Sequence, residues 1–335
     1  MNIPMDALNI VAFSIASFVL GLMALPFTID VLKSSGIVAR DCYKKGEVYV
    51  PTNGGLVIGL VVLIMLSVSV VAVPDLSVSF IVVYVAVVYA IFGILDDRLK
   101  ITNRWIKIFF PYFLSYPVIL ITQPHALHTI SLFVDITPSM QIFFYYIIVP
   151  VYVMVVANMV NMHSGFNGLQ SGLSSIVLFF LLLKSVMVGR IENLTIFAAF
   201  FGANLAFWTR NRYPSAIFEG NIGAMLIGSV MGVFIVFQGF LISGIIMLFP
   251  HTINFLMYFY WRIRRKIRRM HKTPLGEYDS YKFGELREDG TIKVPNRLTL
   301  KWLPPYHRLM TERQVVRIMY ALTIVSCTAG LCVPY

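Results

Sequence analysis

Long apolar stretches separated by short polar breaks follow one another along almost the whole chain. A helix needs about 20 apolar residues to cross the hydrocarbon core of a bilayer, and ten stretches of nearly that length can be recognised. They lie at residues 9–32, 55–73, 76–95, 106–122, 140–160, 169–188, 194–209, 221–236, 239–261 and 314–334. We therefore expect an all-α integral membrane protein with about ten transmembrane helices.

Positive charge alternates between successive breaks. The loops after odd-numbered stretches, with their flanks, contain all of the 27 lysines and arginines except Lys184, Arg190 and Arg317. Cytoplasmic loops of membrane proteins carry an excess of Lys and Arg, so these loops are predicted to be cytoplasmic, with both termini on the other side. The same bias explains the net charge of +11. We therefore expect membrane lipids as surroundings and no nucleic acid as a partner.

The composition is too hydrophobic for a water-soluble domain. Hydrophobic residues make up 58% of the chain and charged residues 13%, which predicts a single polytopic membrane domain over residues 1–335. Its longest polar segment, residues 262–313, is a basic cytoplasmic loop between the last two spans. The three cysteines do not suggest a disulfide framework.

Polar side chains gather at the ends of two predicted helices on the cytoplasmic side. The segment GILDDRLKITNRWIK places Asp96 and Asp97 at the end of the third stretch, and Asn158, Asn161 and Asn167 follow the fifth. Adjacent carboxylates can be an ordinary solvated membrane boundary. Together with amide oxygens, however, they make a hard oxygen site suited to Mg²⁺. Such a site, with phosphate groups as co-ligands, is typical of phosphoryl transfer.

Basic residues on the same side could receive phosphate charge. Lys44, Lys45 and Lys107 lie in the first two cytoplasmic loops, and the segment RIRRKIRRMHK begins the last one. Most of its arginines are explained as an anchor on anionic lipid, whereas His271 and Lys272 are candidates for the site. All of these candidate site residues lie in loops on the predicted cytoplasmic side. This arrangement favours an active site at the membrane surface over a transport pathway at the bilayer midplane.

Three further histidines have no assigned chemistry. His163 lies in the segment NMHSGFNG, where it is either a loop histidine without a role or part of the site. His125 and His128 fall in a loop predicted on the outer side, so we expect them to be inert.

Four segments resemble the polyprenyl-phosphate N-acetylhexosamine-1-phosphate transferase family. NMVNMHSGFNGLQSG is similar to the family pattern NxxNxxxGxNGLxxG, and GILDDRLKITNRWIK to its DD segment with a phosphate-binding lysine, here Lys107. YVPTNGG resembles the PxxGG turn, and RYPSAIFEGN the YPSxxFxGD segment. FPHTINFL, PNRLTLKWL and Met270–Pro274 resemble the branch that transfers GlcNAc-1-phosphate from UDP-GlcNAc to dolichyl phosphate.

The resemblance implies a role for each candidate residue. The catalytic residues would be Asp96, Asp97 and Lys107. The ligands of Mg²⁺, or alternatively Mn²⁺, would be Asp97, Asn161 and Asn221. The substrate-binding residues would be Lys44, Asn158, Asn167, Gly168, Leu169, Glu219, His271 and Lys272.

The resemblance also implies the reaction and its place. UDP-GlcNAc and a dolichyl or other polyprenyl phosphate would be the substrates, UMP would be released, and the product would start lipid-linked oligosaccharide synthesis for protein N-glycosylation. The enzyme would lie in the cell membrane if archaeal, which the short last loop favours, or in the endoplasmic reticulum membrane if eukaryotic. A homodimer is compatible with the sequence.

One departure and two rivals stay open. Where the family pattern ends in FxGD, this chain has Asn221, so either the lineage tolerates an amide, Glu219 supplies the missing carboxylate, or the chain is less active. The first rival is a family member with another UDP-sugar or an undecaprenyl acceptor. The second is a transporter or flippase of a lipid-linked anion, which would require charged groups deep in the spans, where Lys184 is the clear basic candidate.

Overall fold

The computed structural model describes residues 5–72, 75–99, 101, 103–122, 137–279 and 283–334. His125 and His128 lie outside the described residues. Helices make up most of this part of the chain, and the strands form two small antiparallel hairpins.

The first half of the chain contains α1 (Met5–Ser34), α2 (Gly55–Ala72), α3 (Ser77–Leu99), α4 (Arg104–Leu114), a 3₁₀ helix (Tyr116–Ile121), α6 (Pro138–Phe143), a π-helical turn (Phe144–Ile148) and α7 (Val149–Met162). The second half contains α8 (Leu169–Met187), α9 (Thr195–Asn211), α10 (Gly220–Gln238), α11 (Leu241–Met247), α12 (Phe249–Met270), α13 (Leu303–His307) and α14 (Glu312–Leu331). Short 3₁₀ helices cover Gly276–Tyr278 and Leu300–Trp302. The hairpins pair β1 (Val38–Arg40) with β2 (Tyr49–Pro51), and β3 (Glu285–Leu286) with β4 (Ile292–Lys293).

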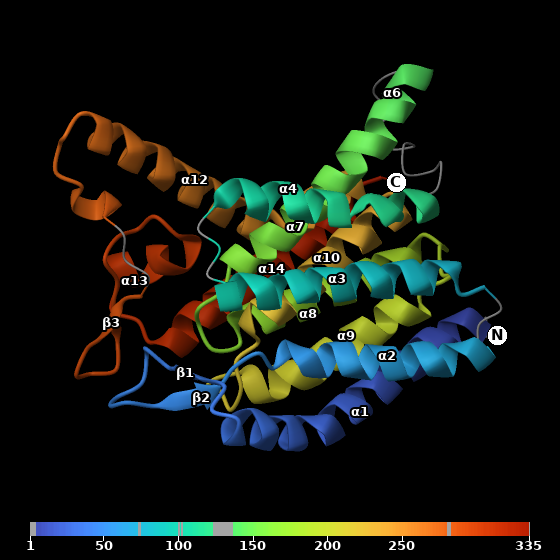
Figure 1. The fold of residues 1–335 in the computed structure, drawn as a ribbon, viewed down its shortest axis with the longest axis horizontal. Helices are drawn as coiled ribbons and strands as arrows, with labels where there is room; N and C mark the ends of the chain where they lie inside the picture. The colour runs from blue at the N-terminus through green and yellow to red at the C-terminus, as the bar shows by residue number, and fades with distance from the viewer. Residues whose placement is uncertain are drawn as a thin grey trace.

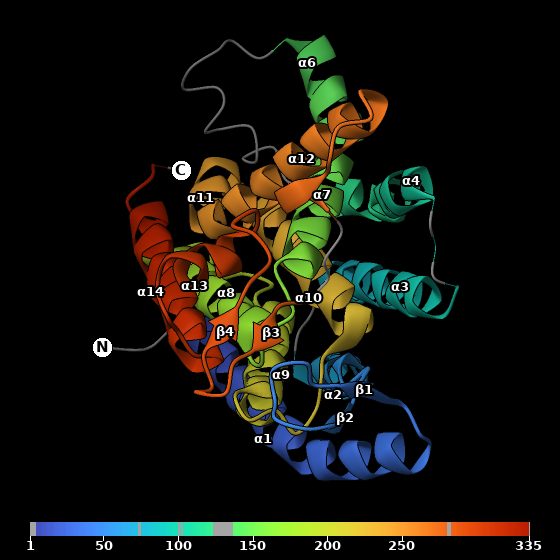
Figure 2. The ribbon, with the colours of Figure 1, turned by 90° about the vertical axis from the view of Figure 1, so that its left-hand side faces the viewer.

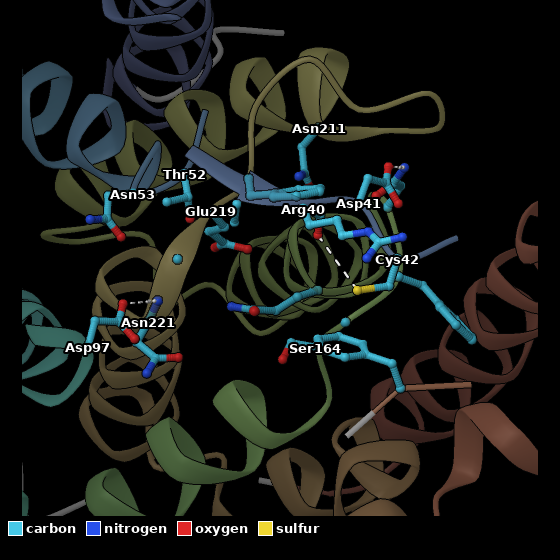
Figure 3. Close-up of a pocket in the computed structure, with 18 of the residues that line it drawn as sticks. Arg40, Asp41, Cys42, Thr52, Asn53, Asp97, Ser164, Asn211, Glu219 and Asn221 are labelled. Carbon is cyan, nitrogen blue, oxygen red and sulfur yellow. Dashed lines mark hydrogen bonds between the residues drawn. The ribbon is translucent and has the colours of Figure 1, made fainter. Parts of the chain in front are cut away.

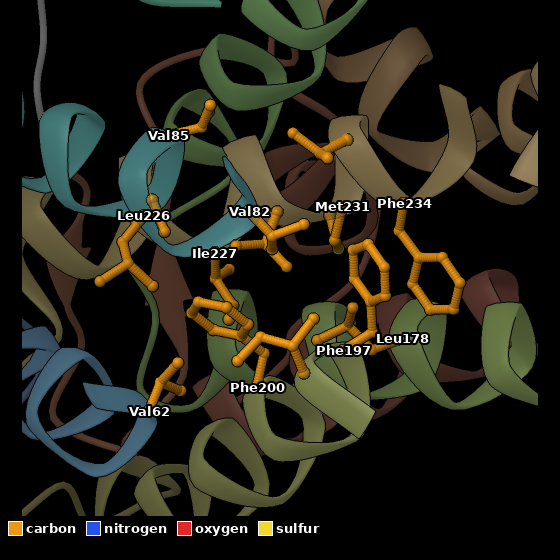
Figure 4. Packing of buried hydrophobic residues seen from close by; sticks show 14 of the residues in the cluster. Val62, Val82, Val85, Leu178, Phe197, Phe200, Leu226, Ile227, Met231 and Phe234 are labelled. Carbon is orange, nitrogen blue, oxygen red and sulfur yellow. The ribbon is translucent and has the colours of Figure 1, made fainter. Parts of the chain in front are cut away.

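Helix α10 is the centre of the bundle. It is apolar on all sides, and almost every residue from Ile222 to Gln238 is buried, as expected for a helix surrounded by others. It packs against α3, α7, α2 and α8, and Figure 4 shows Leu226, Ile227 and Met231 among buried side chains of the neighbouring helices. Small residues bring backbones close, since a Cβ at Gly228 would lie 2.8 Å from the Cα of Ala157 on α7.

The two ends of the bundle differ. Figure 1 places both termini at one end, and both hairpins and α13 at the other; Figure 2 views the molecule from the hairpin end. The charge pattern predicts that the hairpin end faces the cytoplasm.

Within the described residues, six segments are long and apolar enough to span a membrane: Asp6–Ser34, Ser77–Leu99, Pro138–Met162, Leu169–Met187, Gly220–Gln238 and Glu312–Leu331. A seventh results if α11 and α12, bent by 72° at their junction, count as one. These segments support the all-α membrane class, but they do not confirm the count of about ten. The expected stretches at 55–73 and 194–209 form the short helices α2 and α9, and the one at 106–122 breaks at Ser115.

Lys184 is held at the far end of α8. Its buried Nζ donates to the carbonyl oxygens of Gly330 (3.1 Å) and Val333 (2.7 Å). These oxygens lie at the C-terminus of α14, where helix carbonyls lack intrahelical partners and the helix dipole favours a cation. Lys184 is therefore a helix cap and not the central charge that a transporter would need.

Replacing Lys184 with methionine should lower stability without touching the hairpin end. The change leaves buried carbonyl oxygens without a donor, which costs about 2 kcal/mol. We expect a lower midpoint of thermal unfolding in detergent, whereas Lys45→Met, at an exposed position, should leave the midpoint unchanged. Equal midpoints for Lys184→Met and the unmodified protein would contradict the capping role.

Candidate active site

A glycine sets the distance between α3 and α10. A Cβ at Gly93 would lie 2.6 Å from the carbonyl oxygen of Asn221, so only glycine allows this approach. One turn further along α3, Asp96 and Asp97 reach the start of α10. The backbone N–H of Asn221 donates to Asp97 Oδ2 (3.2 Å), and its Nδ2 donates to Asp96 Oδ2 (3.4 Å).

The two aspartates have different surroundings. Asp96 is buried, and its carboxylate forms an ion pair with Lys107 Nζ on α4, at 2.7 Å from Oδ1. Asp97 is exposed and lines a cavity of about 520 Å³. Asp96 therefore holds Lys107, whereas Asp97 lies in the cavity wall.

This cavity is the meeting point of four distant segments (Figure 3). Its wall comes from the β1–β2 hairpin, the end of α3, the loop between α7 and α8, and the turn before α10. Of the residues predicted for the site, it brings together Asp97, Asn161, Asn167, Glu219 and Asn221. These five residues span more than a third of the sequence, so their meeting is a property of the fold.

The loop after α7 is fixed in place by two carboxylates. Asn167 donates its backbone N–H to Glu312 Oε1 (2.6 Å) and its side-chain Nδ2 to Asp41 Oδ2 (2.9 Å). The next residue, Gly168, has a φ of +73°, and a Cβ there would lie 2.8 Å from the Cα of Arg212. The glycine and the two hydrogen bonds together fix the orientation of the Asn167 amide.

Lys44 binds the two carboxylates that hold Asn167 in place. Its Nζ lies 3.2 Å from Asp41 Oδ2 and 3.1 Å from Glu312 Oε2, and 3.8 Å from the centre of the Tyr213 ring. It does not line the cavity. The structure therefore places Lys44 between two carboxylates, behind Asn167.

Lys301 also supports the loop. Its Nζ donates to the carbonyl oxygen of Ser164 and lies 5.2 Å from the centre of the Phe166 ring. Burial lowers the pKa of Lys301 to about 8. Neither Lys301 nor the acceptors Asp41 and Glu312 could be found from a local motif. PNRLTLKWL, which contains Lys301, indicates only a resemblance to one branch of the family.

Glu219 is a buried carboxyl that faces the cavity. Neither of its oxygens has a hydrogen-bond partner among the described residues, and burial raises its pKa to about 8. An ionised carboxylate without a partner is unfavourable in such a place, so the position suits a bound cation.

The oxygen donors around the cavity fit a hard divalent ion. Asp97 and Glu219 offer carboxylates, and Asn161 and Asn221 offer amide carbonyls, which are ligands that Mg²⁺ accepts. No group of three His, Cys, Asp or Glu side chains forms a metal site within the described residues. A cation in this cavity would therefore bind to the two carboxylates together with other oxygen atoms, such as those of the amides, waters or substrate phosphates.

Comparison with known proteins identifies the family. A protein of Sulfolobus acidocaldarius, provisionally named UDP-N-acetylglucosamine–dolichyl-phosphate N-acetylglucosaminephosphotransferase, is 30% identical over 309 residues, which cover 87% of both chains. The model of glycosyl transferase family 4 matches residues 79–239. This chain belongs to glycosyl transferase family 4.

Two other relatives show the range of this similarity. A protein of Saccharolobus solfataricus with the same provisional name is 28% identical over 246 residues, covering 72% of this chain and 75% of the relative. The phospho-N-acetylmuramoyl-pentapeptide-transferase of Caldicellulosiruptor bescii is 27% identical over 234 residues, covering 64% and 70%. Family membership and the apolar helices together make this chain a membrane glycosyltransferase.

Other predicted site residues lie away from the cavity of this family 4 protein. Asn158 donates to the carbonyl oxygen of Met154 within α7 (2.9 Å), and Leu169 is buried at the start of α8. His271 and Lys272 are exposed beyond the end of α12. Neither they nor Gly168, Asp96 and Lys107 line the cavity. Asp96 lies behind the lining residue Asn221, whose Nδ2 donates to it (3.4 Å), and holds Lys107 there.

His163 is part of the core. Its ring is fully buried and lies edge-on to His251 of α12, with ring centroids 4.9 Å apart. Burial lowers the pKa of His163 well below its usual range. The imidazole therefore packs beneath the loop as a neutral group and does not line the cavity.

Adding one methyl group at Gly93 should disrupt the site. The Cβ of Gly93→Ala would press on the backbone of Asn221, which cannot rotate away, so α3 and α10 would separate. We expect transfer activity to fall about 100-fold, since a displacement of about 1 Å can have that effect. Gly59→Ala is the matched control, because its Cβ would meet a flexible Leu226 methyl at 3.5 Å. An equal loss in both variants would contradict this explanation.

Proposed function

We propose that this protein transfers GlcNAc-1-phosphate from UDP-GlcNAc to a dolichyl or similar polyprenyl phosphate and releases UMP. The product would start lipid-linked oligosaccharide synthesis for protein N-glycosylation. The observation that carries the proposal is the single cavity in which Asp97, Asn161, Glu219 and Asn221 meet. The names of the two archaeal relatives support the donor and the acceptor.

The reaction exchanges one phosphoanhydride partner for another. A phosphate oxygen of the acceptor attacks the β-phosphorus of UDP-GlcNAc and forms a new P–O bond. The bond from that phosphorus to the bridging oxygen breaks, and its electron pair leaves on UMP. The second pKa of a phosphate monoester is about 6, so the acceptor is largely dianionic at neutral pH and needs no general base.

The residues in and beside the cavity would bind the metal, the acceptor and the nucleotide. Asp97, Asn161, Glu219 and Asn221 would hold Mg²⁺, or Mn²⁺ in its place, which when bound neutralises charge on the diphosphate. Lys107, oriented by Asp96, would hold the acceptor phosphate at the edge of the cavity. Asn167, fixed by Asp41 and Glu312, would orient the nucleotide.

The position of the cavity suits one substrate from the membrane and one from the aqueous side. It lies at the ends of α3, α7 and α10, beside the β1–β2 hairpin. The lipid acceptor would reach it along the membrane and the nucleotide sugar from the cytoplasm, where we place this end of the bundle because of its positive charge. We place the protein in a cell membrane, in line with its archaeal relatives.

A different UDP-sugar is the rival within the family, because the Caldicellulosiruptor relative is named for a muramoyl-pentapeptide substrate. Purified protein should be incubated with UDP-GlcNAc, UDP-GalNAc or UDP-MurNAc-pentapeptide, each with dolichyl or undecaprenyl phosphate. The masses of the lipid products should show GlcNAc diphosphate on dolichol as the preferred product. Preference for the muramoyl donor or the undecaprenyl acceptor would replace the proposed substrates.

A thiol in the cavity wall offers a chemical test. Cys42 lines the cavity, whereas Cys332 is exposed at the end of α14. Maleimide should modify Cys42 and inactivate the enzyme, and UDP-GlcNAc should protect both the thiol and the activity. Labelling of Cys332 is the internal control, since the nucleotide should not affect it. Full activity after complete modification of Cys42 would place the nucleotide elsewhere.

A further inference from the structure

Helix α12 leaves the bundle with an unpartnered apolar face. It follows α11 after a 72° bend, and its first turns pack on α7 and α14. Figure 1 shows its last turns projecting beyond the ends of α3, α4 and α7. The projecting part therefore meets whatever surrounds the protein at the hairpin end.

Large hydrophobic side chains form one stripe along this helix. The apolar stripe consists of Leu256, Phe259, Tyr260, Ile263, Ile267 and Met270, all exposed. Spacings of three and four residues place them on one side of a helix. The exposed fractions of Ile263, Ile267 and Met270 are 43%, 41% and 68%, far too large for a face that packs on the protein itself.

The rest of the helix surface is basic. Six cations follow Trp261: Arg262, Arg264, Arg265, Lys266, Arg268 and Arg269. No acidic residue occurs between Glu219 and Glu277. A helix with an apolar stripe and a basic remainder is typical of one that lies at a membrane surface.

The protein itself occupies part of the basic face. The segment after α12 folds back, so that Arg268 donates to the carbonyl oxygen of Pro274 (2.7 Å) and lies 4.9 Å from the centre of the Tyr278 ring. The side chains of Lys266 and Arg269 are exposed and form no hydrogen bond or ion pair with the described residues. In helical projection Lys266 flanks the apolar stripe, at the level where lipid phosphates would lie.

A second copy of the chain fits this face poorly. The stripe has the spacing of a coiled-coil seam, but Arg264 and Lys266 occupy the flanking positions, where like charges oppose pairing. An anionic surface has the complementary charge. We propose that the last turns of α12 lie in the membrane interface, with the apolar stripe in the acyl region and Lys266 and Arg269 on the headgroups of anionic lipids.

The proposal goes beyond the proposed function, and its test needs no transfer activity. An environment-sensitive fluorophore would be attached at Ile267→Cys or, as the control, at Thr273→Cys, which is exposed beyond the helix. Cys42 and Cys332 would be replaced by serine, while buried Cys327 would stay. The protein would be placed in nanodiscs of phosphatidylcholine, with or without phosphatidylglycerol, that contain a quencher on the lipid acyl chain.

We expect quenching at position 267 to be about threefold stronger than at 273, because an interfacial helix buries its apolar face by about 5–10 Å. Phosphatidylglycerol should strengthen it further, and Lys266→Glu/Arg269→Glu should remove that increase. Equal quenching at both positions would overturn the proposal, as would energy transfer between labelled copies in place of lipid quenching. Strong quenching that responds to neither phosphatidylglycerol nor the charge reversal would overturn the headgroup contacts.

Discussion

Replacing Asp97 with asparagine should abolish sugar-phosphate transfer and leave the fold intact. Asp97 is the exposed carboxylate of the cavity, and it accepts a hydrogen bond from the backbone N–H of Asn221 (3.2 Å). Asparagine keeps the shape and an acceptor oxygen but removes the charge. Because position 221 is already an amide, the site would keep one carboxylate, Glu219. We expect the turnover rate to fall about 1,000-fold, as for a lost electrostatic contact to the transition state.

The matched control is Asp75, which lies at the opposite end of α3 from Asp97. Asp75 is exposed and accepts a hydrogen bond from the backbone N–H of Ser77 at the start of α3 (2.9 Å), so Asp75→Asn should keep full activity. Both variants should unfold at the temperature of the unmodified protein. Normal turnover by Asp97→Asn would remove Asp97 from the catalytic site, whereas unfolding of that variant would assign it a structural role.

Replacing Glu219 with glutamine should have the second largest effect. Both oxygens of this buried carboxyl lack a hydrogen-bond partner among the described residues, and the chain has an amide at 221 where the family pattern has an acid. If Glu219 supplies the missing charge, Glu219→Gln should reduce transfer about 100-fold and require more Mg²⁺ for half-maximal rate. A magnesium titration of the initial rate measures both effects.

Stability separates this role from a structural one. Burial raises the pKa of Glu219 to about 8, so at neutral pH folding of the metal-free protein requires this carboxyl to be protonated, which lowers stability. A neutral amide avoids that cost, so metal-free Glu219→Gln should unfold at the same temperature as the unmodified protein or higher. Glu192→Gln, at an exposed position between α8 and α9, should change neither property. An unchanged magnesium titration for Glu219→Gln would show that an amide at 221 suffices without help from Glu219.

Some residues of the cavity wall could be named from the sequence because their side chains share one chemistry, that of hard oxygen donors. Asp97, Asn161 and Asn221 were expected to share a metal, and the structure brings their side chains to one cavity. The supporting contacts could not be predicted in the same way. Lys44 was expected on a phosphate, but it binds Asp41 and Glu312, and Glu312 is 268 positions away in the chain.

The fold class followed from hydropathy, whereas the number of spans did not. Apolar windows show where lipid or core is favourable, but they do not show where a helix breaks. The stretch at 106–122 divides at Ser115, and Pro117 is the second residue of the 3₁₀ helix that follows. Proline lacks the backbone N–H that would continue the α-helix. The bend between α11 and α12 lies within one apolar window, beside Pro250, and also changes the direction of the basic segment.

The most direct test of the account is release of UMP from UDP-GlcNAc by the purified protein with dolichyl phosphate, measured with Mg²⁺ and with a chelator. We predict UMP release that needs both the lipid acceptor and the metal, and that disappears in Asp97→Asn. UMP release that persists with the chelator, or no UMP from a folded protein with any family donor, would contradict the proposed metal-dependent transfer.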